Sequence, residues 1–236
     1  MVNDLFETQQ EFNWILPQDI VEIIYDCKGE DYLKNFQMIK KIISNQISNN
    51  ISKGIKGFVL HGLPGTGKTT LAKVISKSLN IPLLFVDGSD IAHHYYGESE
   101  QRVKKIFKEA ERKKSIILID DAESVFPDRE WAKGQSWHNS QNNMLLHTLD
   151  NLDTSKTIVI MTTNKYNLLD SALKDRLYNV EFKTPEIEVL IEIAEKKCKE
   201  LNIEDKEIIK EIKLKDFQSI RDIEKLIMER YVGGLK

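Results

Sequence analysis

The sequence predicts an α/β fold, with a three-layer core built on a parallel sheet and a small all-helical lid after it. Between residues 57 and 182, short continuous apolar runs alternate with segments of helical period, which is the pattern of βαβ units with helices on both faces of a sheet. Beyond this stretch only helical periodicity remains. We therefore expect an N-terminal segment with a leading helix (1–52), an α/β core (53–185) and a helical lid (186–236).

The spacing of apolar residues predicts the individual elements. Continuous runs of the buried, parallel-sheet type predict strands at 58–60, 83–86, 115–119 and 157–161. Apolar residues that recur every three or four positions predict helices over 33–47, 71–79, 98–114, 187–198 and 220–228. A further helix is expected over 142–149.

Composition narrows the class of protein. Hydrophobic residues make up 41% and charged residues 30% of the 236 residues, which is ordinary for a globular chain. The longest aliphatic run, Ile116–Ile119, is far shorter than the roughly 20 residues of a membrane span. No secretory signal is visible, and Cys27 and Cys198 lie far apart, so we expect a cytoplasmic protein with reduced thiols. The net charge of −3 argues against strongly electrostatic binding of nucleic acid.

A glycine-rich turn follows the first predicted strand and opens a helix. Its sequence, Gly62–Thr69, matches the pattern G-x-x-x-x-G-K-[ST], which predicts a P-loop NTPase core. The glycines let successive N–H groups point at phosphate, Lys68 would reach the β- and γ-phosphates, and the Thr69 hydroxyl would sit on Mg²⁺. The residues expected to bind the nucleotide are Pro64, Gly65, Thr66, Gly67, Lys68, Thr69 and Thr70.

Two carboxylates end the third predicted strand, at the edge where ligands of α/β sheets bind. Asp120 fits the Mg²⁺-side acid of a Walker-B element, which holds the ion through its water shell. Asp121 would face the water that attacks the γ-phosphate. The alternative is that the two carboxylates only cap the following helix.

With these motifs in place, the chain resembles the AAA+ ATPases, and within them the members that thread or remodel proteins. The resemblance runs over residues 53–229, and its further motifs are Thr162–Asn164 after the fourth strand, Leu169–Arg176 and Tyr95–Glu100. It implies ATP and Mg²⁺ as cofactors. It also implies a homo-oligomeric ring or spiral, commonly a hexamer, that acts on a protein substrate.

The resemblance implies roles for polar residues outside the P-loop. Asn164 would bind the attacking water or the γ-phosphate, and Arg176 would act as an arginine finger on the neighbouring subunit's nucleotide. Alternatively, Asn164 caps a turn and Arg176 pairs with a surface acid. Arg221 lies where many members place a sensor-2 arginine, although a solvent-facing helix charge is an equal alternative. Asp150 is similar to an aspartate by which some relatives sense the adjoining nucleotide.

Two features depart from the family pattern. Asp121 stands where the family usually has glutamate, whose side chain is one methylene longer. Misplacement of a catalytic group by about 1 Å can lower the rate about a hundredfold. The shorter side chain of Asp121 therefore predicts slow hydrolysis. Arg176 is the only arginine in the finger region, where many relatives carry two.

The segments that would touch a substrate are also indicated by the resemblance. Tyr95, Tyr96 and Gly97 are similar to the family's aromatic pore loop, whose exposed rings would grip an extended polypeptide. Stacking on nucleic-acid bases is the rival interpretation. Arg129–Ser140, with two tryptophans, corresponds to a second pore loop, and the basic cluster within 104–114 is explained by a solvated or inter-subunit face.

The sequence therefore predicts an ATPase that uses ATP and Mg²⁺ in a ring to remodel, unfold or translocate a protein, with an adaptor protein as a possible further partner. Two alternatives stay open. One is a nucleic-acid motor or loader, and the other is a slowly hydrolysing structural assembly that nucleotide stabilises.

Overall fold

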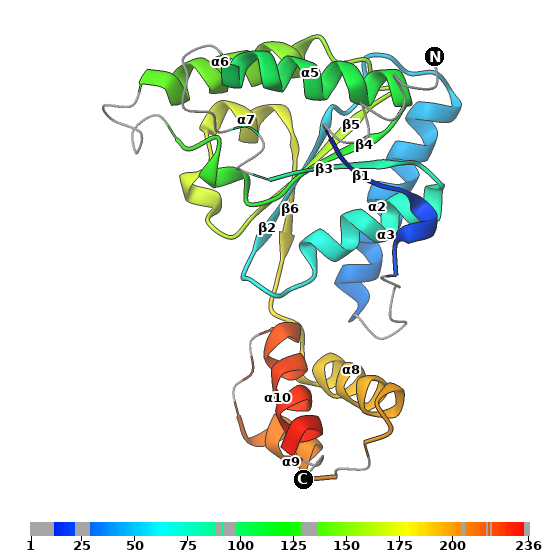
Figure 1. The fold of residues 1–236 in the computed structure, drawn as a ribbon. Helices are drawn as coiled ribbons and strands as arrows, with labels where there is room; N and C mark the ends of the chain where they lie inside the picture. Colours follow the sequence, from blue (N-terminus) through cyan, green and yellow to red (C-terminus); the bar gives the residue numbers. More distant parts are fainter. Residues whose placement is uncertain are drawn as a thin grey trace.

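The computed structural model describes residues 12–21, 29–87, 91, 98–128, 136–203, 206–215, 217 and 219–233. In this part of the chain the strands form a six-stranded sheet in the order β1-β3-β4-β5-β2-β6 (Figure 1). Their bounds are β1 (Asn13–Ile15), β2 (Gly57–Gly62), β3 (Leu83–Val86), β4 (Ile116–Ile119), β5 (Ile158–Thr163) and β6 (Tyr178–Phe182). All neighbours pair in parallel except β1, which runs antiparallel to β3. The predicted α/β core with its parallel sheet is confirmed.

The two strands that the apolar runs did not indicate lie at the two edges of the sheet. Strand β1 is only three residues long. Strand β6 buries alternate residues and exposes Tyr178, Asn179 and Glu181. Edge strands can leave part of their surface to solvent, so neither segment needs the continuous apolar run by which a central strand is recognised.

Helices cover both faces of the sheet. Helices α2 (Gly29–Ser48) and α3 (Lys68–Leu79) pack on one face, and α5 (Glu98–Lys113), α6 (Ser136–Asp150) and α7 (Ser171–Arg176) pack on the other. Successive strand residues alternate between the two hydrophobic clusters: Phe58 and Leu60 join the cluster of α2 and α3, while Val59 joins that of α5 and α6. This alternation explains why the central strands are apolar throughout.

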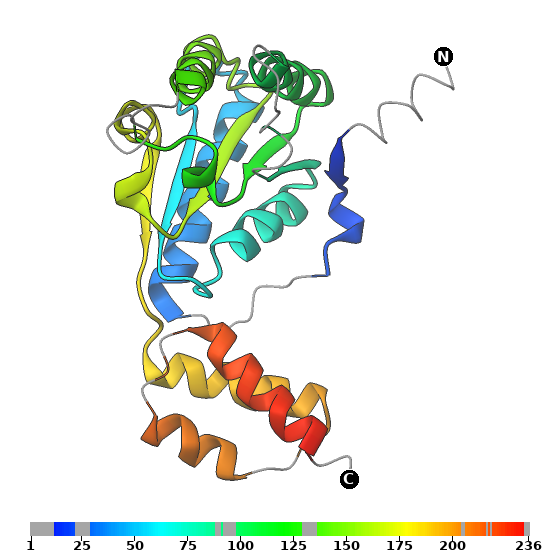
Figure 2. The ribbon, with the colours of Figure 1, turned by 60° about the vertical axis from the view of Figure 1, so that its left-hand side comes forward.

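Three further helices follow β6 and lie together below the sheet in both views (Figures 1 and 2). They are α8 (Ile187–Glu200), α9 (Lys206–Leu214) and α10 (Ile220–Gly233), and they share a hydrophobic cluster of their own. The Ile220 N–H donates to the Gly65 carbonyl oxygen at 3.1 Å, which ties the start of α10 to the glycine-rich turn. Among the described residues, no helix combines the length and hydropathy that crossing a membrane requires.

The N-terminal strand is fixed to the core by aromatic contacts. The Arg102 guanidinium lies 4.6 Å from the ring centroid of Phe12, and the Lys113 ammonium lies 4.2 Å from that of Trp14. Both cations belong to α5. Together with its pairing to β3, these cation–π contacts hold β1 along the edge of the sheet.

Candidate functional site

The glycine-rich turn between β2 and α3 forms a cradle around the Lys68 side chain. Gly62, Gly65 and Gly67 have φ angles of 140°, 75° and 90°, a region that side chains with a Cβ rarely adopt. The Lys68 ammonium donates to the carbonyl oxygens of Gly62 at 2.9 Å and Leu63 at 2.7 Å. Burial lowers the pKa of Lys68, and the nearby carboxylates of Asp120 and Asp121 oppose that shift.

Thr69 and Asp120 are in direct contact, as the P-loop and Walker-B elements require. The Thr69 hydroxyl donates to Asp120 Oδ1 at 2.8 Å, and the Thr162 hydroxyl donates to the same oxygen at 2.5 Å. Strand β4, which ends just before Asp120, pairs with β5, which carries Thr162. A hydroxyl and a carboxylate at adjacent positions are oxygen donors of the kind that Mg²⁺ prefers, so these residues fit that ion.

Asp121 and Asn164 form the second polar pair of the site. Asn164 Nδ2 donates to Asp121 Oδ1 at 3.1 Å, and the Asn164 N–H faces Glu123 Oε1 at 3.4 Å. Asp121 has a left-handed backbone, with φ of 50° and ψ of 50°. Partial burial raises the pKa of Asp121, and the like charges of Asp120 and Glu123 raise it further.

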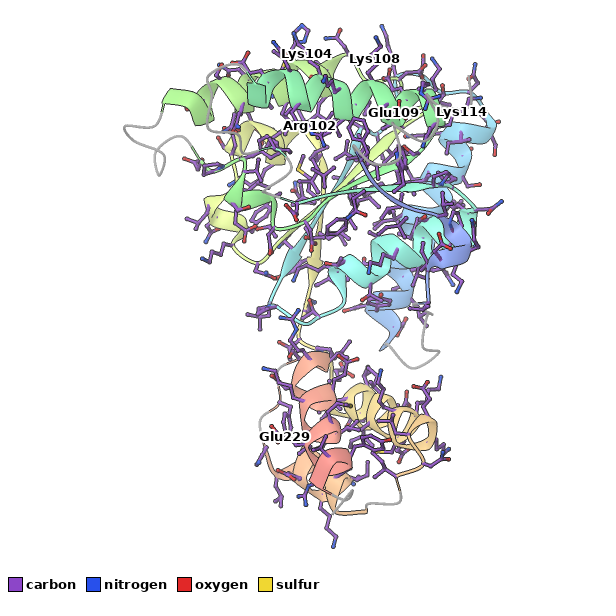
Figure 3. The ribbon with its side chains drawn as sticks, viewed as in Figure 1. Arg102, Lys104, Lys108, Glu109, Lys114 and Glu229 are labelled. Atoms are coloured by element: carbon purple, nitrogen blue, oxygen red, sulfur yellow. The ribbon has the colours of Figure 1, made fainter. Side chains whose placement is uncertain are left out.

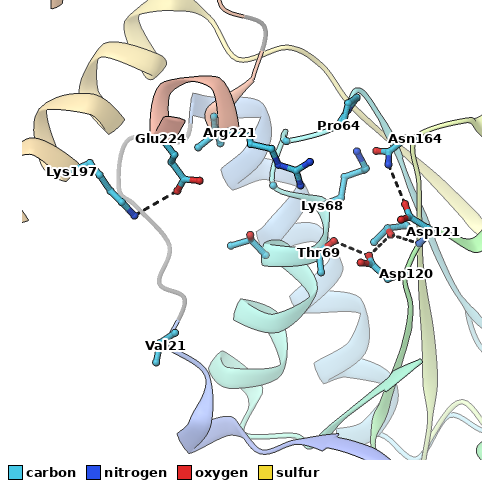
Figure 4. Close-up of a pocket in the computed structure, with 15 residues that line it drawn as sticks. Val21, Pro64, Lys68, Thr69, Asp120, Asp121, Asn164, Lys197, Arg221 and Glu224 are labelled. Atoms are coloured by element: carbon cyan, nitrogen blue, oxygen red, sulfur yellow. Dashed lines mark hydrogen bonds and ion pairs between the residues drawn. The ribbon is translucent and has the colours of Figure 1, made fainter. Parts of the chain in front are cut away.

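These groups surround a single cleft of about 530 Å³ between the core and α8 and α10 (Figure 4). Arg221, at the start of α10, lines the cleft and faces Lys68 across it. At the end away from Asp120, Lys197 and Glu224 line the cleft and form an ion pair at 3.5 Å.

The roles of several cleft residues have no sequence signature. Thr162 belongs to the Thr162–Asn164 motif, but the motif does not indicate the hydrogen bond that Thr162 donates to Asp120. Lys197 and Glu224 are charged residues on amphipathic helices, and such residues are ordinarily expected to face solvent. They become recognisable only when the helices are placed beside the P-loop.

Arg176 lies away from this cleft. In the described part of the chain, α7 contributes no residue to the cleft lining. The Arg176 guanidinium instead pairs with Asp150 at the end of α6, with Nε at 3.1 Å from Oδ1 and Nη2 at 3.3 Å from Oδ2. The pairing with a surface acid that sequence reasoning left open as an alternative is therefore present in the structure.

The substrate-contact predictions fall largely outside the described residues. Tyr95, Tyr96 and Gly97 lie outside them, as does Trp131. The last five residues of the second predicted loop, Arg129–Ser140, are helical, because α6 begins at Ser136. On α5, Lys104 and Lys108 of the basic cluster are exposed and point away from the sheet (Figure 3).

Comparison with known proteins shows which family the chain resembles. The family model described as "ATPase family associated with various cellular activities (AAA)" matches residues 58–184. The 26S proteasome regulatory subunit 8 homolog of Saccharomyces cerevisiae is 31% identical over 204 residues, covering 80% of this chain and 50% of that protein. The cell division cycle protein 48 homolog of Archaeoglobus fulgidus is 40% identical over 121 residues, covering 50% of this chain and 16% of that protein.

The ATP-dependent zinc metalloprotease FtsH of Clostridium perfringens is 38% identical over 121 residues, covering 50% of this chain and 17% of that protein. The chain thus spans half or less of the length of these relatives. The region matched by the family model contains the glycine-rich turn, both acids of the Walker-B strand and Asn164. The chain belongs to the AAA family of ATPases.

Proposed function

We propose that this chain binds ATP with Mg²⁺ and hydrolyses it. The observation that carries the proposal is the gathering of Lys68, the Thr69–Asp120 pair and the Asp121–Asn164 pair around one cleft (Figure 4). Bound Mg²⁺ would neutralise charge on the phosphate oxygens. Membership of the AAA family supports the same activity.

Each polar group has a distinct task in this proposal. Lys68 exchanges its two carbonyl contacts for phosphate oxygens, and Thr69 and Asp120 hold the metal side of the nucleotide. Asp121 accepts a hydrogen bond from the attacking water, and Asn164, already bonded to Asp121, fixes the direction of that carboxylate. Arg221 approaches the phosphates from the start of α10, a position that its place in the cleft supports.

Slow turnover is part of the proposal. The Asp121 carboxylate is on a shorter side chain than the family's glutamate, so it would sit further from the attacking water. The same observation favours a second candidate function, in which ATP binding stabilises an assembly and hydrolysis is incidental.

We further propose a homo-oligomeric ring that acts on protein. Arg176 lies outside its own cleft, which supports a role on the nucleotide of a neighbouring copy. Two relatives carry names that connect them to protein breakdown, a proteasome regulatory subunit and an ATP-dependent metalloprotease. Tyr95, Tyr96 and Gly97 would provide the substrate contact, and an adaptor protein could select the substrate.

The test measures ATP binding and steady-state turnover across a range of protein concentrations. Lys68→Ala should weaken ATP binding by about a hundredfold or more, because it removes the group that contacts two phosphates. Lys104→Ala is the matched control, since Lys104 is exposed on the outer face of α5. Asp121→Asn should still bind ATP but lose turnover. Unchanged turnover in Asp121→Asn would contradict the assigned chemistry.

A further inference from the structure

Arg176 contacts Asp150 and Ala172 directly, and Lys56 contacts the same Asp150 carboxylate. Arg176 Nε and Nη2 donate to the two carboxylate oxygens of Asp150, and its Nη1 donates to the Ala172 carbonyl oxygen at 3.1 Å. The Lys56 ammonium donates to Asp150 Oδ1 at 2.8 Å. Asp150 is 26 residues from Arg176 and 94 residues from Lys56 in sequence.

We propose that Asp150 and Lys56 are positioning residues for Arg176, which orient its guanidinium and keep the three-residue group cationic for a phosphate bound to an adjacent copy of this chain. The proposal rests on the proposed function, in which Arg176 acts on the neighbour's nucleotide. It assigns Lys56 a role that no motif indicates.

The contacts leave Arg176 able to bind an anion. A guanidinium carries five N–H donors in a fixed plane, and the three contacts to Asp150 and Ala172 use one donor on each nitrogen. Two donors therefore remain, and 34% of the Arg176 side chain is exposed. Because the bidentate contact fixes the guanidinium plane in advance, less rotamer entropy is lost when a phosphate arrives.

Lys56 sets the charge of the group. Arg176 and Asp150 alone would form a neutral pair, whose attraction for a phosphate would be weak. The addition of Lys56 gives two cations around one carboxylate, so the contact group has a net charge of +1. The hydrogen bonds from Arg176 and Lys56 lower the pKa of Asp150 to about 2, so the carboxylate stays ionised at neutral pH. Asp170 and Asp175 act on the guanidinium more weakly.

Helix α7 is also fixed at its other end. The Asp170 carboxylate accepts from the N–H groups of Ala172 at 2.9 Å and Leu173 at 3.3 Å. Its second oxygen accepts from Asn142 Nδ2 at 2.9 Å. Asn142 and Asp150 both belong to α6, so α6 holds the start of α7 through one residue and the guanidinium at its end through the other.

The experiment uses mixed assemblies of two inactive variants. A donor carrying Lys68→Ala retains Arg176 but lacks a working cleft, and an acceptor carrying Arg176→Ala retains the cleft. We expect the mixture to regain ATP turnover that neither variant has alone. Adding Asp150→Asn to the donor should lower the kcat of the mixture about tenfold. Without the bidentate contact to Asp150, the Arg176 guanidinium would be wrongly oriented toward the neighbour's phosphate most of the time.

Lys56→Met in the donor should lower kcat about threefold, through the lost charge, and Lys56→Arg should restore it. The KM for ATP should stay unchanged throughout, because the acceptor's cleft is not altered. Lys53→Met is the matched control, because it removes a neighbouring exposed charge and should leave kcat as it was. Gel filtration of each donor checks that it still assembles.

Three results would overturn the inference. Unchanged kcat with the Asp150→Asn donor would mean that Arg176 needs no holder, and a raised kcat would mean that Asp150 restrains Arg176. A mixture without turnover, when the unaltered chain hydrolyses ATP, would remove the action of Arg176 on the neighbour and the inference with it, while the cleft assignments would stand. Failure of the unaltered chain to bind ATP would instead remove the proposed function itself.

Discussion

Lys68 and Arg176 are two cations with proposed roles at phosphate, and the chain fixes them in opposite ways. Lys68 bonds to carbonyl oxygens five and six residues away, inside its own turn. Arg176 depends on a carboxylate 26 residues away, which in turn is paired with a lysine 94 residues from it. The P-loop is therefore a local structure with a sequence signature. The Arg176 region exists only after α6, α7 and the start of β2 have packed together.

The largest expected effect comes from breaking the local structure. A Cβ on Gly65 would lie 2.9 Å from the Cβ atoms of Ser219 and Arg221, and its φ of +75° disfavours any side chain. Gly65→Ala should therefore displace the start of α10 and strain the turn. We expect ATP affinity to fall about a hundredfold, where each tenfold change in affinity corresponds to about 1.4 kcal/mol of binding free energy. Titration calorimetry measures the change. Leu63→Ala, in the same turn but exposed, is the control, and equal affinity in the two variants would contradict the argument.

The next largest effect comes from breaking the non-local structure. Asp170 is buried and bonds to two N–H groups of α7 and to Asn142. Asp170→Ala removes a helix cap and leaves the Asn142 amide without this partner, so we expect a loss of about 2–3 kcal/mol in the free energy of unfolding. Urea denaturation measures it. Asp175→Ala, exposed on the same helix, should stay within about 0.5 kcal/mol, and similar losses in both variants would refute the cap argument.

A smaller effect is expected at Asp121, where one substitution should change stability and turnover in opposite directions. Its left-handed backbone is tolerated by aspartate better than by glutamate. We expect Asp121→Glu to cost about 1 kcal/mol in stability and at the same time to raise turnover, because the longer arm reaches the water. Parallel denaturation and turnover measurements separate the two effects, with Asp121→Asn as the stability control. Unchanged or lower turnover in Asp121→Glu would defeat the idea that the short side chain slows hydrolysis.

The smallest effect concerns the strand that leads into the P-loop. His61 stacks on Tyr166 of η3 (Tyr166–Leu168), with ring centroids 4.1 Å apart. Burial lowers the pKa of His61 below its ordinary 6.5, so the unfolded chain binds a proton more readily and stability is lost as pH falls below about 6.5. His61→Phe keeps the stacking and removes the titration.

We expect the unaltered chain to lose more stability than His61→Phe when the pH falls from 7.5 to 5.5, because the lowered pKa of His61 acts in the unaltered chain alone. Thermal denaturation at both pH values measures the difference. Because the other histidines are common to both proteins, they do not enter the comparison. Identical losses would mean that His61 stays accessible to protons in the folded state.

The same contrast explains what the sequence could predict. Lys68, Thr69 and Asp120 were identified because their motifs are short and each follows a strand of continuous apolar residues. Lys56 could not be identified in this way, because a single lysine before β2 forms no motif. Its contact with Asp150 depends on the strand order β5-β2-β6 in the sheet. Arg176 and Asp150 were each noted from the family resemblance, but their contact with one another could not be derived without the packing of α6 against α7.

The edge strand β1 has a practical consequence for anyone who trims this chain. The family model begins at residue 58, yet β1 covers one side of β3 with backbone hydrogen bonds. A fragment that starts at the family boundary would lose α2 from one face of the sheet. It would also leave β3 with open N–H and C=O groups, which are a template for pairing with other chains. It would also uncover the apolar surface beneath Phe12. Such a fragment should form aggregates during expression, whereas one that starts before residue 12 should remain dispersed.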